Sequence, residues 1–255
     1  TVETLSVEPK ITISENAIET KIIENEAEFV SIWNKAKRKL VLVGVNETNT
    51  IDSSIVENLA NDPSVVVLTE TTSNLHHPNF INSIDTLITP FDDADFKALE
   101  PEILVTFGGM IVSKRIKGFL RKYKPKQHWH IDTLRAYDTF GALTEHFVMK
   151  PNDFFIKLFA KTDFAKSNYF SEIKKIYDLR KAKRNEYLQK IPFSDFKVFD
   201  EIIKSLPKDS QLQISNSSAI RYAQLIDIDD SIEVFCNRGT SGIDGSTSTA
   251  IGAAV

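Results

Sequence analysis

The chain has 255 residues, of which 42% are hydrophobic and 26% are charged, and its formal net charge is −4. Its 17 phenylalanines exclude a mainly disordered chain, and one cysteine excludes a disulfide framework and a cysteine-based zinc site. The negative charge argues against a general nucleic-acid binder. No apolar run is long enough to span a membrane and no signal peptide is visible, so we expect a cytoplasmic protein with neither nucleic acid nor membrane as partner.

Residues 1–24 are polar and alternate only weakly in hydrophobicity, which indicates a linker or an edge segment. Short apolar runs then alternate with amphipathic segments, one of which begins at a capping serine, Ser113. The expected strands are residues 40–45, 65–69, 85–88, 103–107, 127–131 and 146–149. The expected helices are residues 26–38, 51–60, 92–99 and 113–123. This alternation is typical of a parallel sheet covered on both faces, so we predict a doubly wound α/β domain over residues 25–180.

Residues 181–255 are predicted to begin a second α/β domain that the sequence does not complete. The elements expected in and before this part are a helical stretch over 151–206, a strand over 212–214, a helix opened by Asn216 and Ser217, a strand over 232–236 and a glycine-rich segment over 237–252. The last four residues, Gly-Ala-Ala-Val, are apolar, whereas domain ends are usually polar and exposed. We therefore expect the sequence to be a piece of a longer protein.

The glycine-rich segment follows an expected strand and precedes an expected helix. Glycines let a backbone approach a ligand closely, and N–H groups at a helix start suit an anion. The glycine spacing matches neither a dinucleotide fingerprint nor a P-loop. A ligand-binding loop and a tight structural turn are therefore both compatible with this segment.

Two further patterns suggest anion binding. Ser217 and Arg221 are four residues apart, so they share one face of a helix that starts at the carboxyl edge of a sheet, which suits a carboxylate. A capping serine beside a solvated arginine is the alternative. Seven basic residues lie between Lys114 and Lys126, and no acidic residue occurs from Ile103 to Ile131. Lys114 and Arg115 lie nearest the preceding loop, so they either face an anionic substrate or belong to a solvated basic helix face.

The segment Asn237-Arg-Gly-Thr-Ser-Gly-Ile-Asp-Gly-Ser-Thr-Ser-Thr-Ala-Ile-Gly resembles one family closely. It is similar to the 2-succinyl-5-enolpyruvyl-6-hydroxy-3-cyclohexene-1-carboxylate synthases (the MenD type), thiamine-diphosphate enzymes of menaquinone biosynthesis. Asn216-Ser217-x-x-x-Arg221 and Ser113-Lys114-Arg115-Ile116 resemble two other motifs of that family, in the same order.

The resemblance implies three α/β domains, of which this sequence would hold the middle domain and the start of the diphosphate-binding domain. The cofactor-activating glutamate and the Gly-Asp metal motif are not in this sequence, so no residue is assigned as a metal ligand. The longer protein would use thiamine diphosphate with Mg²⁺ or Mn²⁺, whereas we expect neither to be held by this piece alone. It would form a homodimer or a homotetramer.

In such enzymes 2-oxoglutarate loses CO₂ and the resulting four-carbon carbanion adds to isochorismate. The resemblance implies that Ser217, Arg221 and Arg238 hold carboxylates of the 2-oxoglutarate-derived group and that Lys114 and Arg115 serve isochorismate. It assigns four residues to the cofactor: Asn216, Ser241, Gly242 and Ile243. The alternative is an α/β module that binds a small dianion without catalysis.

Overall fold

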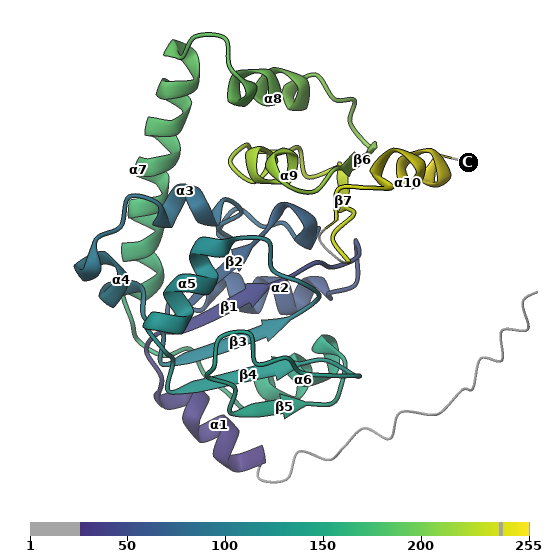
Figure 1. The fold of residues 1–255 in the computed structure, drawn as a ribbon. Coiled ribbons are helices and arrows are strands. Elements are labelled where there is room, and N and C mark those ends of the chain that lie inside the picture. Colours follow the sequence, from purple (N-terminus) through teal and green to yellow (C-terminus); the bar gives the residue numbers. More distant parts are fainter. Residues whose placement is uncertain (1–25, 240–241, 255) are drawn as a thin grey trace, which may run out of the picture.

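The computed structural model describes residues 26–239 and 242–254 (Figure 1). The first part contains α1 (Glu26–Lys35), β1 (Lys39–Val43), α2 (Ser53–Asn61), β2 (Val65–Thr69), the 3₁₀ helix η1 (Thr71–Ser73), α3 (Ile84–Ile88), α4 (Asp93–Leu99), β3 (Ile103–Phe107), α5 (Lys114–Lys122), β4 (Gln127–Ile131), β5 (Glu145–Phe147) and α6 (Pro151–Phe159). The second part contains α7 (Tyr169–Lys190), α8 (Asp195–Lys204), β6 (Gln211–Ile214), α9 (Ser218–Ala223), β7 (Glu233–Cys236) and α10 (Ser246–Ala253).

The first part is built on a five-stranded parallel sheet with the strand order β2-β1-β3-β4-β5. Every residue of β1, β2 and β3 is buried, because helices cover both faces of the sheet. Val41 and Val43 point into a core shared with α1, α2 and α6, whereas Leu40 and Leu42 point into one shared with α3, α5 and α7. The predicted doubly wound α/β fold is confirmed.

One predicted strand is wrong. Residues 85–88 form most of helix α3, not a strand. Ile84, Leu87 and Ile88 are all buried, and their spacing of three and four residues is that of one helix face. A segment this short carries too few residues to separate the helical period from the strand period.

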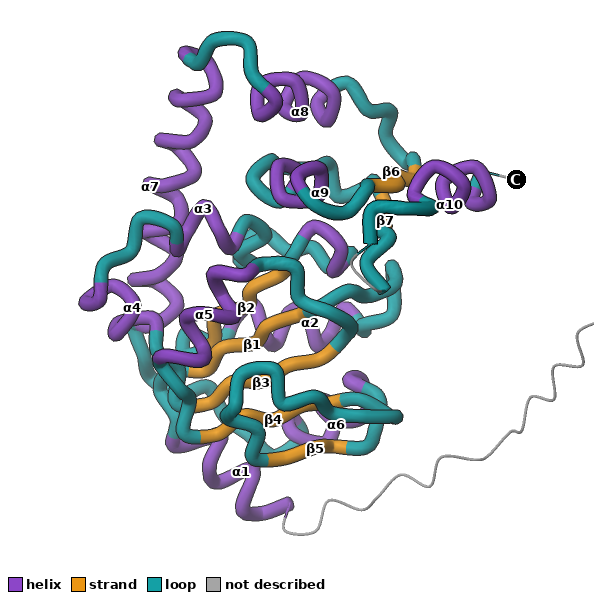
Figure 2. The backbone as a smooth tube through the Cα atoms, in the orientation of Figure 1, coloured by secondary structure: helices purple, strands orange, loops and turns teal. Residues whose placement is uncertain are grey.

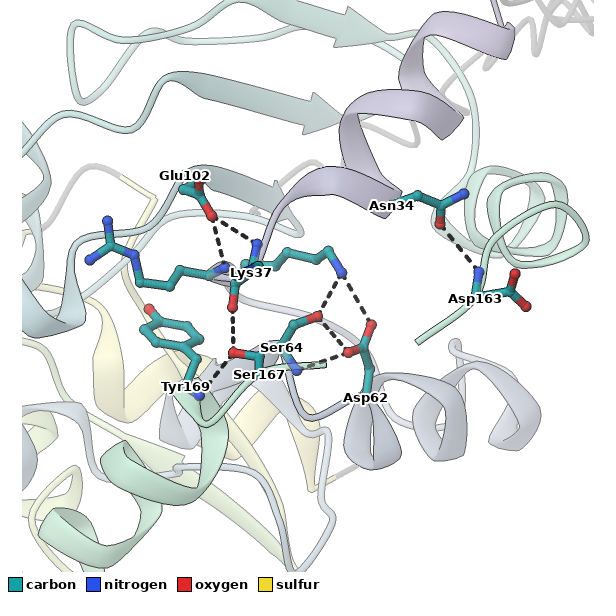
Figure 3. Close-up of polar contacts among 10 residues, drawn as sticks. Asn34, Lys37, Asp62, Ser64, Glu102, Asp163, Ser167 and Tyr169 are labelled. Atoms are coloured by element: carbon teal, nitrogen blue, oxygen red, sulfur yellow. Dashed lines mark hydrogen bonds and ion pairs between the residues drawn. The ribbon is translucent and has the colours of Figure 1, made fainter. Parts of the chain in front are cut away.

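The amino edge of the sheet contains a buried ion pair. Lys39 is fully buried, and its Nζ lies 2.6 Å from Ser64 Oγ and 3.4 Å from Asp62 Oδ2. The same ammonium lies 4.8 Å from the ring centroid of Trp33. Burial lowers the pKa of Lys39, and Asp62 opposes this shift. Ser64 also donates from its backbone N–H and its hydroxyl to Asp62, so the carboxylate remains hydrogen-bonded within the fold (Figure 3).

A second polar contact closes this edge. Glu102 Oε2 accepts hydrogen bonds from the backbone N–H groups of Lys37 at 2.8 Å and Arg38 at 3.2 Å. The Ser167 hydroxyl, just before α7, donates to the Lys37 carbonyl (Figure 3). These contacts tie the segment between α1 and β1 to the start of β3 and to the segment before α7.

The second part begins with α7, which extends away from the sheet toward α8 and α9 (Figure 1). The boundary predicted between residues 180 and 181 falls inside this helix. Strands β6 and β7 pair in parallel (Figure 2), and β7 lies against η1 of the first part. Asn74 joins the two parts, because its side chain donates to the Val234 carbonyl and accepts from the Val234 N–H. No helix within the described ranges is long and apolar enough to cross a bilayer.

Candidate functional site

A ligand site is expected first where the carboxyl ends of β1 and β3 meet. In this strand order, the crevice between those two strands is the usual ligand position of a doubly wound sheet. Here the protein's own backbone fills it: Gly44 N donates to Phe107 O at 2.9 Å and Gly109 N donates to Val45 O at 2.6 Å. A Cβ on Gly44 would lie 2.0 Å from the Gly109 carbonyl oxygen, so only glycine fits there.

The loop after β3 leads into α5, whose first two residues are Lys114 and Arg115. Ser113 caps this helix as predicted, because its hydroxyl oxygen accepts from the Ile116 N–H at 3.2 Å. The same hydroxyl donates to Asp85 Oδ1 at 2.5 Å. Lys114 and Arg115 are both exposed, and neither forms an ion pair within the part of the chain that the structure describes. Both cations are therefore available to an external anion.

A buried carboxylate that we did not predict from the sequence lies behind these cations. Glu70 is only 4% exposed, and its two oxygens accept from the N–H groups of Val112 at 2.5 Å and Ser113 at 2.6 Å. Burial raises the pKa of Glu70 to about 7, and the two hydrogen bonds oppose that shift. The available sequence signal was an acidic residue directly after the apolar run of β2.

The structure brings together the second motif and the glycine-rich segment. Arg238 Nη1 donates to Asn216 Oδ1 at 2.7 Å, and Asn216 Nδ2 donates to the Gly242 carbonyl at 3.3 Å. Arg238 Nε is buried and has no hydrogen-bond partner among the described residues. The parallel pairing of β6 and β7 explains this meeting, because it brings the carboxyl ends of both strands to one edge. Ser241 lies outside the described residues.

Ser217 is the N-cap residue of α9, as in the capping alternative, but its side chain makes no capping hydrogen bond to the helix. Its φ of 73° lies in the left-handed region, which costs a residue other than glycine about 1–3 kcal/mol. Arg221 is exposed on α9, and its side chain has no ion pair or hydrogen bond within the described ranges. A strained serine and a free arginine thus follow β6.

Cations from both parts of the chain influence one another. Lys117, on α5, is half-buried and donates to the Ile111 carbonyl at 3.0 Å. Burial is the largest cause that lowers the pKa of Lys117, and repulsion from Arg238 is the next, while Glu70 opposes both. The basic start of α5 and the arginine after β7 therefore contribute to one positive region.

A pocket of about 230 Å³ lies beside Lys117, at the carboxyl ends of β3 and β4. The Thr106 hydroxyl on its floor lies 2.9 Å from His128 Nε2 and 2.8 Å from His130 Nδ1. Burial lowers the pKa of His128 to about 4, so this imidazole is neutral near pH 7. Burial also lowers the pKa of His130, so the cations that line the pocket near pH 7 are Lys117 and Arg135.

The chain is similar to known proteins over its full length. A family model described as the middle domain of thiamine pyrophosphate matches residues 10–214. A 2-succinyl-5-enolpyruvyl-6-hydroxy-3-cyclohexene-1-carboxylate synthase of Flavobacterium johnsoniae is 76% identical over all of this chain and 46% of its own length. Proteins of the same name from Flavobacterium psychrophilum and Christiangramia forsetii are 61% and 48% identical over all of this chain, and over 46% and 45% of their own lengths.

The chain thus spans about half the length of the curated relatives it matches. The family model covers most of the chain, including the five-stranded sheet, α7, α8 and β6. The chain therefore belongs to the thiamine pyrophosphate middle-domain family, and its resemblance to the 2-succinyl-5-enolpyruvyl-6-hydroxy-3-cyclohexene-1-carboxylate synthases is confirmed.

Proposed function

We propose that this chain is part of a synthase that decarboxylates 2-oxoglutarate and joins the four-carbon remainder to isochorismate, in menaquinone biosynthesis. The observation that carries the proposal is the set of cations without an internal partner at the carboxyl edges of the two sheets. Lys114, Arg115 and Arg221 have no ion pair among the described residues, and Arg238 Nε has no acceptor. Both substrates are dianions, so a site for them needs several such cations. The names of the relatives agree with the proposal.

The donor side consists of Ser217, Arg221 and Arg238. In this proposal Arg238 is oriented by Asn216 and keeps its unpartnered Nε for a carboxylate of 2-oxoglutarate. Arg221 supplies a second guanidinium from α9. The Ser217 hydroxyl, which makes no capping hydrogen bond, supplies a neutral donor. The acceptor side consists of Lys114 and Arg115, which bind the carboxylates of isochorismate from the start of α5.

The described residues fit one side of thiamine diphosphate. Ile243 is 72% exposed beside Gly242, and an exposed apolar side chain on a glycine-rich loop suits contact with an aromatic ring. Asn216, Ser241, Gly242 and Ile243 would hold the cofactor, which supplies the carbanion chemistry when bound. The described ranges contain no group of three or more His, Cys, Asp or Glu side chains that could hold a metal. On the family resemblance, we assign Mg²⁺ or Mn²⁺ to other segments of the longer protein. That protein would be a homodimer or a homotetramer.

The test uses the full-length protein that contains this sequence. Purified enzyme is supplied with 2-oxoglutarate, isochorismate, thiamine diphosphate and Mg²⁺, and release of CO₂ is measured together with loss of isochorismate. We expect both to require the cofactor and to occur in equal amounts. Loss of isochorismate without the cofactor, or CO₂ release whose rate does not depend on isochorismate, would refute the proposal. Binding of either dianion without turnover would instead support a non-catalytic module.

A further inference from the structure

Glu70 connects two strands that do not pair with each other. It directly follows β2, whereas the loop that it holds follows β3, and β1 lies between these strands. The carboxylate therefore reaches across the carboxyl end of β1 to the segment that precedes Lys114. Within residues 26–239 and 242–254, no hydrogen bond joins its side chain to a residue predicted for the site.

Glu70 contacts the loop before α5 at two points. The two carboxylate oxygens accept from consecutive backbone amides, those of Val112 and Ser113, which fixes the orientation of the peptide group between them. The contact lies at the amino end of α5, where the helix dipole and unpaired N–H groups favour a negative charge. Asp85, from α3, adds a second anchor through the Ser113 hydroxyl. The first turn of α5 is thus fixed by two acidic side chains from different elements.

We propose that Glu70 is a positioning residue for the acceptor side of the site, because it fixes the first turn of α5 and thereby the direction in which Lys114 and Arg115 meet a dianion. The dianion's identity as isochorismate rests on the proposed function. The contact between Glu70 and the loop does not.

The contact between Glu70 and the loop before α5 depends on the charge of Glu70. The charged groups that face it are Asp85 from α3, which raises the pKa of Glu70, and Lys117 from α5, which lowers it. Burial outweighs both and places the pKa at about 7. A protonated carboxyl turns one oxygen into a donor that faces an amide N–H, so one of the two hydrogen bonds weakens as the pH falls through about 7. Loss of the negative charge also makes the site more positive, which would by itself strengthen dianion binding. The two effects move KM in opposite directions.

Glu70→Gln in the full-length synthase removes the charge and one acceptor together at every pH, so the direction in which KM changes shows which of the two effects is larger. Glutamine keeps the shape and one acceptor oxygen but presents an NH₂ group to the second amide. We expect KM for isochorismate to rise about tenfold, as for the loss of one hydrogen bond to a charged group, with kcat and KM for 2-oxoglutarate nearly unchanged. In the parent, KM for isochorismate should rise as the pH falls through about 7, and Glu70→Gln should lose this dependence.

Glu102→Gln is the matched control. Glu102 also accepts from two consecutive backbone amides, but at the opposite edge of the sheet (Figure 3). We expect it to leave both KM values and the pH profile unchanged. An unchanged or lower KM for isochorismate in Glu70→Gln would overturn the proposal, and so would an equal loss with both substrates.

Backbone amide hydrogen exchange tests the contact without reference to activity. In the 255-residue chain, Glu70→Gln should accelerate exchange of the Val112 and Ser113 amides at about pH 8, and Glu102→Gln should not. Unchanged exchange there would overturn the proposal. If the full-length parent has no synthase activity, the proposed function fails, and exchange at these two amides still decides whether Glu70 holds the loop.

Discussion

Replacing Asp62 by alanine should leave the ammonium of Lys39 without a counter-charge at the amino edge of the sheet. Lys39 is fully buried and Asp62 is 4% exposed, so solvent cannot replace the lost carboxylate. Breaking a buried ion pair by removing one partner typically costs about 3–5 kcal/mol. The cost also has an upper bound, because Lys39 can lose its proton instead of remaining charged without a partner. Neutralising a lysine of ordinary pKa 10.5 at about pH 7 costs about 4.8 kcal/mol, at about 1.36 kcal/mol per pH unit.

The free energy of unfolding should therefore fall by about 3–5 kcal/mol in Asp62→Ala. The penalty should shrink as the pH rises, because a lysine whose pKa is lowered in the folded state binds fewer protons there than in the unfolded state. A double variant, Lys39→Met with Asp62→Ala, removes both charges and should be more stable than Asp62→Ala alone.

Urea unfolding followed by tryptophan fluorescence measures these differences. The chain has two tryptophans, Trp33 and Trp129, and both are buried in the core beneath the sheet. Trp33 also lies directly against the Lys39 ammonium. A loss below about 1 kcal/mol in Asp62→Ala, or a double variant no more stable than Asp62→Ala, would refute the reasoning.

Three further predictions concern the site and its frame. Arg221→Ala and Arg238→Ala in the full-length enzyme should each lower kcat/KM for 2-oxoglutarate roughly tenfold to over a hundredfold, since a charge-assisted hydrogen bond contributes about 1.5–3 kcal/mol. Arg221→Lys and Arg238→Lys should restore only part of this activity. Unchanged kinetics in Arg221→Ala would show that Arg221 is a solvated surface residue. His128 should lower the free energy of unfolding as the pH falls from about 6.5 to about 4, because over this range its imidazole is protonated in the unfolded state but not in the folded state. His128→Gln should flatten melting temperature against pH over that range, and an unchanged slope would show that other groups cause it. Gly44→Ala should destabilise by about 1–3 kcal/mol or more, because its Cβ would meet the Gly109 carbonyl at 2.0 Å. Gly118→Ala, with no neighbour within 4 Å of its Cβ, is the control and should be neutral or stabilising in thermal melts.

The sequence predicted best those elements that depend on local pattern. The apolar runs at 65–69 and 103–107 became β2 and β3 with the expected bounds, since a strand buried on both faces is continuously apolar. Ser113 was recognised as a helix cap because capping depends on a few neighbouring residues. Residues 85–88 were mistaken for a strand because so short a segment fits both periods.

The polar contacts that build the site were harder to predict, because they join residues distant in sequence. Glu70 and Val112 are 42 residues apart, and Asn216 and Arg238 are 22 apart. The motifs indicated that Asn216 and Arg238 belong to one site, but nothing local to Glu70 indicates its partner. The strained backbone of Ser217 also escaped prediction, since serine is an ordinary residue before a helix. The roles assigned to Ser217, Arg221, Arg238, Lys114 and Arg115 stay predictions.

The filled amino end of α5 has a consequence for how charge is recognised at this edge. Because Glu70 already occupies the backbone N–H groups of Val112 and Ser113, an incoming anion cannot use those two groups of the rigid main chain. It meets the flexible, exposed side chains of Lys114 and Arg115 instead. Attraction by exposed cations is screened over about 8 Å at physiological salt, so binding of the incoming anion at this edge weakens as ionic strength rises. The buried Glu70 carboxylate is screened much less by the same ions.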